Sequence, residues 1–232
     1  MNEREKLLNV KETIESIAHQ WRQPLAQINS TVGSIDKILY EKNIQEPLLE
    51  EKLQKIEALT KYMSDTIDDF KKHFLQSTNK EKIVLAEIVQ SAISNVMANL
   101  EENNIKIITE IDVEDECFCY KNQLEQIIMV LLNNSKDALL ERNTFEAEIE
   151  VAIKKSEGHV VLSIGDNAGG ITKSVMQKIF EPYYTTKHNS QGTGIGLYMA
   201  KKIIQEQDGL LSVRNIKSGS EFRITLPEVL KL

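Results

Sequence analysis

The sequence predicts an α+β fold, with an N-terminal helical hairpin that pairs with a second copy as a four-helix bundle, followed by an α/β sandwich domain. Two observations predict it. Up to about residue 75, apolar residues recur every three or four positions in two long stripes, whereas beyond residue 80 short apolar runs alternate with helical patterns. The 232 residues suit one or two domains, and a hydrophobic content of 41% suffices for a packed core.

The first stripe lies in the segment that contains His19 and Pro24. Its spacing averages close to a heptad repeat, and its members are Ile14, Ile17, Trp21, Leu25, Ile28, Val32, Ile35 and Leu39. His19 lies two residues beyond Ile17, about 200° around a helix at ~100° per residue, so we expect its imidazole to face away from the stripe. Pro24 costs a helix interior ~3 kcal/mol. We therefore expect a bend just after His19 that opens the backbone for a partner.

The second stripe predicts the other helix of the hairpin. Its members are Leu49, Leu53, Ile56, Leu59, Met63, Ile67, Phe70 and Phe74. The break falls at residues 43–47, and Pro47 suits the first turn of the second helix. Two helices alone bury such stripes poorly, so we expect a homodimer; packing of the hairpin on its own C-terminal domain is the alternative.

A polar hinge near residues 76–80 separates the hairpin from a second domain. In order, the patterns predict a helix at about 84–101, strands at 105–111 and 117–120, a helix at 122–141, paired strands at 147–155 and 159–165, a helix at 195–207, and strands at 210–214 and 220–226. The segment from Glu181 to Thr193 is polar, contains glycine and has no periodicity, which favours a mobile lid.

Composition excludes several classes of protein. A formal net charge of −7 argues against a general nucleic-acid binder. The longest apolar run, 127–132, is far shorter than the ~20 residues of a membrane span, and the first six residues lack the apolar core of a signal peptide, so we expect a cytoplasmic chain. Cys117 and Cys119 have no second pair and no suitably spaced histidine, so they are interpreted as reduced packing residues.

Three motifs point to a nucleotide. Asn134 lies on the helix predicted at 122–141, and an amide oxygen is a hard neutral ligand that suits Mg²⁺. Asp166 follows an apolar strand and precedes small residues, so its carboxylate can accept a hydrogen bond from an adenine amino group; a plain turn is the alternative. The run Gly192-Thr193-Gly194-Ile195-Gly196-Leu197 ends a loop and opens a helix, which directs backbone N–H groups at phosphates.

These motifs occur in the order and at the distances found in one family, and over almost its whole length the chain resembles the sensor histidine kinases of two-component systems. The matching segments are residues 19–25 (H-box), Asn134 (N-box), 166–170 (G1 box), 180–187 (F-box) and 192–197 (G2 box). The resemblance implies a dimerisation and phosphotransfer hairpin in residues 1–76. It implies a Bergerat-type catalytic ATP-binding domain in residues 81–232.

The resemblance also implies an activity and its residues. It implies an ATP-dependent protein-histidine kinase, with ATP and Mg²⁺ as cofactors, that phosphorylates His19 and passes the phosphoryl group to an aspartate of a response regulator. The candidate catalytic residues are His19, as phospho-acceptor, with Gln20, Arg22 and Gln23, of which Gln23 is associated with regulator dephosphorylation. Asn134 is the candidate metal ligand. The candidate nucleotide-binding residues are Asn134, Asp137, Asp166, Ala168, Gly170, Ile171, Thr186, Lys187, Gly192, Thr193, Gly194, Ile195, Gly196 and Leu197.

Several positions depart from the family pattern, and one of them, Asp208-Gly209 where a glycine pair is common, carries no consequence for the function. Gln20 stands where an acidic residue usually assists deprotonation, and it cannot act as a carboxylate base. Val130 stands where the N-box often has a polar residue and where related ATPases have a glutamate base. Ala168 replaces a glycine, a modest change if its φ is negative. Two alternatives stay open: an ATPase of the same nucleotide fold that drives conformational change, and a dimeric scaffold that binds a partner without catalysis.

Overall fold

The computed structural model describes residues 3–75, 80–111, 116–156, 158–187 and 194–228. For residues 3–18, 20–21, 62 and 65–75 the description is limited to the backbone. The chain divides into two compact units, Met1–Leu75 and Gln76–Leu232.

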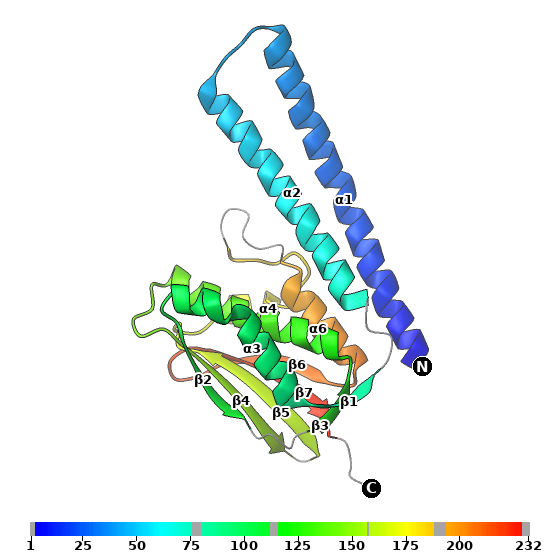
Figure 1. The fold of residues 1–232 in the computed structure, drawn as a ribbon, viewed down its shortest axis with the longest axis vertical. Coiled ribbons are helices and arrows are strands. Elements are labelled where there is room, and N and C mark those ends of the chain that lie inside the picture. Colours follow the sequence, from blue (N-terminus) through cyan, green and yellow to red (C-terminus); the bar gives the residue numbers. More distant parts are fainter. Residues whose placement is uncertain (1–2, 76–79, 112–115, 157, 188–193, 229–232) are drawn as a thin grey trace. The chain divides into compact units, whose positions relative to one another are not determined.

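The first unit consists of two long helices, α1 (Glu3–Glu41) and α2 (Pro47–Leu75), drawn from blue to cyan in Figure 1. Pro24 lies inside α1, yet the helix is continuous on both sides of it. The bend expected just after His19 stays a prediction, since the helix bounds alone do not measure it. Asn43 follows α1 with a left-handed φ of 54°, and its N–H donates to Tyr40 O, as is common where a helix ends.

The two helices contact each other through the predicted stripes. Leu25 and Val32 of α1 and Leu53 of α2 are buried. One buried polar contact joins the same faces, because Thr60 Oγ1 donates to Asn29 Oδ1 at 2.5 Å. The apolar stripes thus meet within this unit, and a hydrogen bond fixes their register.

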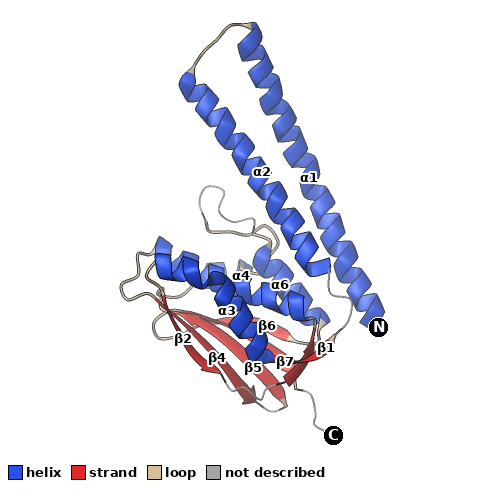
Figure 2. Cartoon of the chain, viewed as in Figure 1, coloured by secondary structure: helices blue, strands red, loops and turns tan. Residues whose placement is uncertain are grey.

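The second unit packs helices on one face of a sheet, as Figure 2 shows. Its helices are α3 (Leu85–Glu102), α4 (Lys121–Glu141), α5 (Lys173–Lys178) and α6 (Gly196–Glu206). Its strands are β1 (Glu81–Val84), β2 (Lys106–Ile111), β3 (Glu116–Cys119), β4 (Glu148–Ser156), β5 (His159–Asp166), β6 (Leu210–Asn215) and β7 (Ser220–Pro227). The main sheet has the order β2-β4-β5-β7-β6, with β2 parallel to β4 and the other pairs antiparallel, and β1 pairs with β3 in a separate sheet.

The core lies between the main sheet and α3, α4 and α6. Alternate residues of the central strands face the helices, which is the pattern of a sheet with one covered face. The buried strand residues include Ile149, Val151, Ile153, Val160, Leu162, Ile164, Phe222, Ile224 and Leu226. Opposite them, α4 contributes Leu124, Ile127, Ile128, Leu131 and Leu132. The predicted α/β sandwich is confirmed.

Two elements were not predicted. β1 falls between the polar hinge predicted near 76–80 and the helix predicted from about 84, and it is a strand because Ile83 and its neighbours pair with β3. α5 has six residues and none is buried, so it carries no apolar period that a sequence could reveal. Its first turn is capped by Thr172, whose hydroxyl accepts from Val175 N at 3.4 Å.

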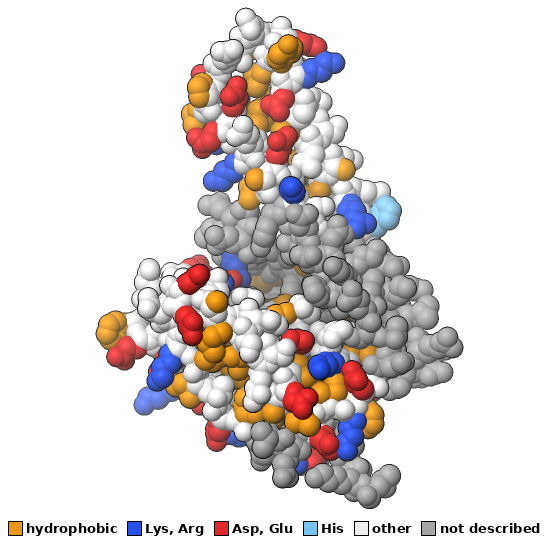
Figure 3. Space-filling view, viewed as in Figure 1, with side chains coloured by type: hydrophobic (Ala, Val, Ile, Leu, Met, Phe, Trp, Pro, Cys, Tyr) orange, Lys and Arg blue, Asp and Glu red, His pale blue; other side chains and the backbone are white. Residues whose placement is uncertain are grey.

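Ion pairs cross between the edge strands of the main sheet and their inner neighbours. At the β2 edge, Lys106 pairs with Glu148 at 3.0 Å. At the β6 edge, Glu221 pairs with Arg214 at 2.5 Å and with Arg223 at 2.6 Å. Burial of Glu221 opposes its ionisation, but the hydrogen bonds from both arginines prevail and lower the pKa of this carboxyl. Figure 3 shows charged and apolar side chains interspersed over one face of the molecule.

Other expectations concern the cysteines and the membrane. Cys117 and Cys119 are buried and unbridged, with their Sγ atoms 3.6 Å apart, in keeping with their interpretation as packing residues. Among the described residues, no helix combines the length and the apolar character needed to cross a membrane.

Candidate functional site

A polar cluster lies on one face of α4. It consists of Asn134 and Asp137 of that helix and of Lys187, which follows α5 in the chain. The first two lie three residues apart, so they share a face of the helix. Lys187 Nζ donates to Asp137 Oδ2 at 2.6 Å and to Asn134 Oδ1 at 3.2 Å, and all three side chains are half-buried. Two side-chain oxygens of α4 therefore accept hydrogen bonds from one cationic group.

The donor set of this cluster fits Mg²⁺, which prefers oxygen ligands and keeps much of its coordination for water and phosphate. The amide oxygen of Asn134 and a carboxylate oxygen of Asp137 would be the ligands that the protein gives to the ion. In the described parts of the chain, no three His, Cys, Asp or Glu side chains gather as metal ligands. A site built from two oxygens needs a further ligand such as a phosphate.

Asp166 is the last residue of β5 and is 4% exposed. Its Oδ1 accepts from the backbone N–H groups of Ala168 at 3.0 Å and Ser220 at 3.3 Å, and its Oδ2 accepts from Ser220 Oγ at 2.7 Å. A carboxylate oxygen can accept two hydrogen bonds, so Oδ2 retains one acceptor position. The fixed carboxylate thus suits an amino group of a ligand.

The turn after Asp166 is held in an unusual backbone shape. Gly169 and Gly170 have φ values of +83° and +81°, a region that glycine tolerates. Ala168 is not among the residues with positive φ, so the alanine at this position fits without strain, as expected. Asn215 holds the end of the turn, since its Oδ1 accepts from Ile171 N and its Nδ2 donates to Ile171 O, both at 2.8 Å.

The glycine-rich run ends beside the lid segment and against α4. Tyr183 N donates to Gly194 O at 2.9 Å, and a side chain on Gly194 would lie 2.4 Å from the Tyr183 carbonyl carbon. α6 begins at Gly196, as predicted, and a Cβ there would lie 3.2 Å from Val130 Cγ1. The N-terminus of α6 therefore approaches the helix that carries Asn134.

The structure brings the candidate nucleotide residues into two groups and leaves others apart. Asn134, Asp137 and Lys187 meet on α4, and the turn after β5 brings Asp166, Ala168, Gly170 and Ile171 together. Thr186 is exposed, Ile195 is buried and Leu197 is half-buried. Gly192 and Thr193 lie outside the described residues, together with the rest of the predicted lid from residue 188 onward.

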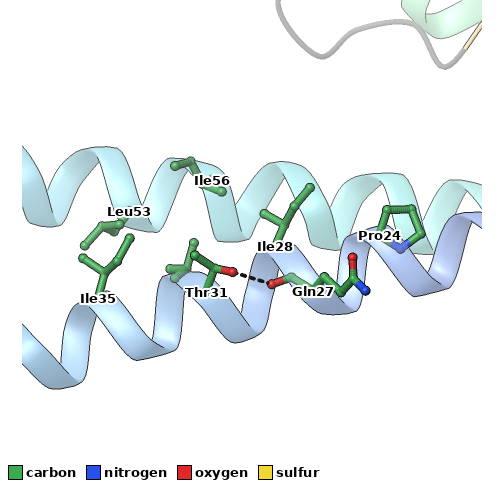
Figure 4. Close-up of a pocket in the computed structure, with 8 residues that line it drawn as sticks. Pro24, Gln27, Ile28, Thr31, Ile35, Leu53 and Ile56 are labelled. Carbon is green, nitrogen blue, oxygen red and sulfur yellow. Dashed lines mark hydrogen bonds between the residues drawn. The ribbon is translucent and has the colours of Figure 1, made fainter.

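The candidate catalytic residues lie in the first unit. His19, Arg22 and Gln23 are exposed on α1, so the prediction that the imidazole faces away from the buried stripe agrees with the structure. The side chain of Gln20 lies outside the described residues. From Pro24, the residue after Gln23, an apolar groove opens between α1 and α2 (Figure 4). It is lined by Pro24, Gln27, Ile28, Thr31, Val32, Ile35, Leu53 and Ile56.

Sequence reasoning missed three residues that shape the site. Ser220 holds the Asp166 carboxylate, Asn215 holds Ile171, and Arg142 contacts the carbonyls of the turn. Each is remote in sequence from the motif that it supports. Their only sequence signal is a polar residue at the end of a predicted element, which is common.

Comparisons with known proteins agree with this geometry. Residues 119–230 match the family described as "Histidine kinase-, DNA gyrase B-, and HSP90-like ATPase". The chain is 27% identical over 235 positions to the two-component sensor PprA of Pseudomonas aeruginosa, an alignment that covers 96% of the chain and 25% of that relative. The chain thus spans about a quarter of that relative's length.

Solved structures show the same fold. The catalytic domain of histidine kinase ThkA superimposes with a TM-score of 0.58 at 23% identity, over 65% of this chain and 97% of that one. ThkA in complex with the response regulator protein TrrA gives a TM-score of 0.57 at 20% identity, over 98% of this chain and 64% of that one.

Proposed function

Given that this chain is a relative of the sensor histidine kinases, with their ATPase domain in residues 119–230, we propose that it is an ATP-dependent protein-histidine kinase. It phosphorylates His19 and passes the phosphoryl group to an aspartate of a response regulator. Residues 1–76 are the dimerisation and phosphotransfer domain, and residues 81–232 are the catalytic ATP-binding domain.

The observation that carries the proposal is the pairing of two recognition features in one small domain. Asp166 offers a fixed acceptor position to the adenine amino group, and Asn134 with Asp137 offers two oxygens to a cation. A nucleoside triphosphate with its metal has these features at its two ends. Lys187 and the N-terminus of α6 supply positive charge for the phosphates between them.

Mg²⁺, held by Asn134 Oδ1 and the Asp137 carboxylate, would neutralise charge that develops on the phosphates. The protein's own part is positioning. Asp166 orients the base, while the glycine run and Lys187 hold the phosphate chain. The exposed His19 offers an imidazole nitrogen, which attacks the γ-phosphorus as the bond from that phosphorus to the bridging oxygen breaks, leaving ADP.

The exposed apolar side chains of the first unit favour a homodimer as the active form. Ile28, Ile35 and Ile56 line the groove between α1 and α2 and are 43%, 37% and 37% exposed. Apolar side chains on a helical face are stabilised when a second pair of helices covers them. A dimeric four-helix bundle would cover this groove while His19 stays accessible.

Regulator dephosphorylation is a second activity of the same α1 face. Gln23 lies four residues beyond His19, one helical turn along, and both are exposed. An amide there can hold a water in line with an aspartyl phosphate on a docked regulator. The reaction consumes that water and releases inorganic phosphate.

The kinase proposal is tested by incubating the chain with ATP labelled in the γ-phosphate and mapping the labelled residue. Acid-labile label on His19 is expected. His19→Ala should lose the label while binding Mg-ATP as the parent does. His159→Ala, which removes an exposed histidine of β5, is the matched control and should label normally. Label that persists in His19→Ala would refute the assignment.

The same experiment separates the alternative activities. ADP formation without phosphohistidine would favour an ATPase that drives conformational change. Val130 argues against that activity, because an apolar side chain cannot activate water as a glutamate would. Failure to bind Mg-ATP would favour a non-catalytic scaffold.

A further inference from the structure

Arg142, the residue that follows α4, reaches two backbone carbonyls of the turn after Asp166. Its Nη2 donates to Gly170 O at 2.7 Å and its Nη1 donates to Ala168 O. The two carbonyls flank Gly169, where an added Cβ would lie 2.9 Å from Nη1. The turn is therefore shaped so that two carbonyls converge on one guanidinium, with no side chain in between.

This turn needs external support because of its backbone. Gly169 and Gly170 both adopt positive φ, and consecutive glycines have many other conformations available. On one side the β6–β7 connection supports it, since Gly169 N donates to Ser218 O at 2.9 Å and Asn215 holds Ile171. Arg142 supports the side that faces α4.

The position of Arg142 connects the two ends of the nucleotide site. α4 carries Asn134 and Asp137, and Arg142 follows them by eight and five residues. At 1.5 Å per residue, the helix sets about 12 Å between Asn134 and Arg142. α4 thus carries the metal-binding oxygens, and Arg142 directly after it holds the adenine-binding turn.

We propose that Arg142 is a positioning residue, which ties the turn that presents Asp166 to α4 and so sets the span between the adenine contact and the metal contact of one bound ATP. This inference rests on the proposed ATP-binding function. An arginine suits the task because its planar fork can meet two acceptors at once. A lysine meets two carbonyls less rigidly, and a glutamine has only one amide group to offer.

The test compares the full-length parent with Arg142→Lys, Arg142→Gln and the control Glu141→Gln, which changes a neighbouring exposed charge at the same helix end. Dissociation constants for Mg-ATP and Mg-GTP are measured by calorimetry, and hydrogen exchange is followed in the peptide that spans residues 167–171. Arg142→Gln should weaken Mg-ATP about tenfold with little change for Mg-GTP, because the contact with the adenine amino group is what the turn presents. Arg142→Lys should fall between parent and Arg142→Gln, and Glu141→Gln should match the parent.

Faster exchange at 167–171 in unliganded Arg142→Gln, without faster exchange in β4 and β5, is expected as well. An unchanged ratio of ATP to GTP affinity in Arg142→Gln would overturn the inference, and so would a general loss of protection across the sheet. If the parent itself bound no Mg-ATP, the proposed function would fail and this inference with it. If the parent bound Mg-ATP without labelling His19, the positioning role would still be decided by the nucleotide affinities.

Discussion

Lys187 Nζ lies 2.6 Å from Asp137 Oδ2, so a cation from the lid segment already occupies the face of α4 on which Mg²⁺ is proposed to bind. The two side chains are 25% and 35% exposed, which screens the pair and keeps its contribution modest. The ammonium group of Lys187 donates hydrogen bonds to Asp137 and Asn134, and these contacts need no nucleotide. Metal binding must therefore displace it.

The first prediction follows from this competition. Lys187→Met should lower the Mg²⁺ concentration needed for half-maximal nucleotide binding by about threefold, because a part-exposed ion pair no longer opposes the metal. At saturating Mg²⁺ the same variant should bind ATP more weakly than the parent, because the proposed contact of Lys187 with the phosphates is lost. The measurement is a Mg²⁺ titration at a fixed, sub-saturating concentration of a fluorescent ATP analogue, repeated at saturating Mg²⁺ with increasing analogue. Lys178→Met, an exposed lysine of α5, is the control. A higher Mg²⁺ midpoint in Lys187→Met would contradict the competition.

The second prediction separates Asp166 from the residue that holds it. Asp166→Asn should weaken Mg-ATP binding at least about tenfold and abolish the preference for ATP over GTP, because the carboxylate itself meets the amino group. Ser220→Ala should cost only about threefold and keep the preference, since two backbone donors still hold Oδ1. Competition of both nucleotides against a fluorescent analogue measures the ratio. Equal preference in Asp166→Asn and the parent would remove the adenine role.

The third prediction concerns Gln23. Gln23→Ala should leave labelling of His19 within about twofold of the parent, because the acceptor nitrogen is untouched, while it slows regulator dephosphorylation about tenfold. The lifetime of regulator phosphate is measured with parent or variant kinase added in the absence of ATP. Gln54→Ala, an exposed glutamine of α2 that does not line the groove, is the control. An unchanged lifetime with Gln23→Ala would return this residue to an ordinary surface role.

The fourth prediction addresses the first unit. Thr60 is 4% exposed and its hydroxyl contacts Asn29, so Thr60→Val should destabilise the unit by about 1 kcal/mol through the lost hydrogen bond. Thermal unfolding of the full chain, followed by circular dichroism, measures the shift. Ser34→Ala is the control, since that hydroxyl is exposed, donates within α1 to Ser30 O and does not line the groove. Equal shifts for the two variants would mean that the contact between the helices contributes nothing.

Most of the second unit could be predicted because its elements carry strong periodic signals. α4 was expected at 122–141 and runs from Lys121 to Glu141, since its apolar residues recur with a helical period and lie against the sheet. The nucleotide motifs were also visible, because a glycine at Gly170 or Gly194 and an acid at Asp166 are local choices. Local patterns of this kind persist in the fold.

The remaining features depend on contacts between distant residues. β1 is four residues long and becomes a strand by pairing with β3, more than thirty positions away along the chain. Arg142 and Ser220 reach the Asp166 turn across 26 and 54 positions, so neither carries a signal where it stands. The contact of Lys187 with Asp137 spans 50 positions. The sequence predicted Lys187 as a phosphate ligand. It could not reveal that Lys187 pairs with Asp137 when no phosphate is bound.

The ion pairs at the two edges of the main sheet disfavour its extension by a strand of another copy. An unprotected edge strand invites another strand to extend the sheet, which is a route to aggregation. At both edges here a newcomer would have to strip water from charged groups already engaged with an inner strand, Lys106 with Glu148 and Arg214 with Glu221. Growth through the sheet is thereby discouraged in a crowded cell. Under the proposed dimerisation, the exposed isoleucines Ile28, Ile35 and Ile56 of the helical unit, and not the sheet edges, supply the pairing surface.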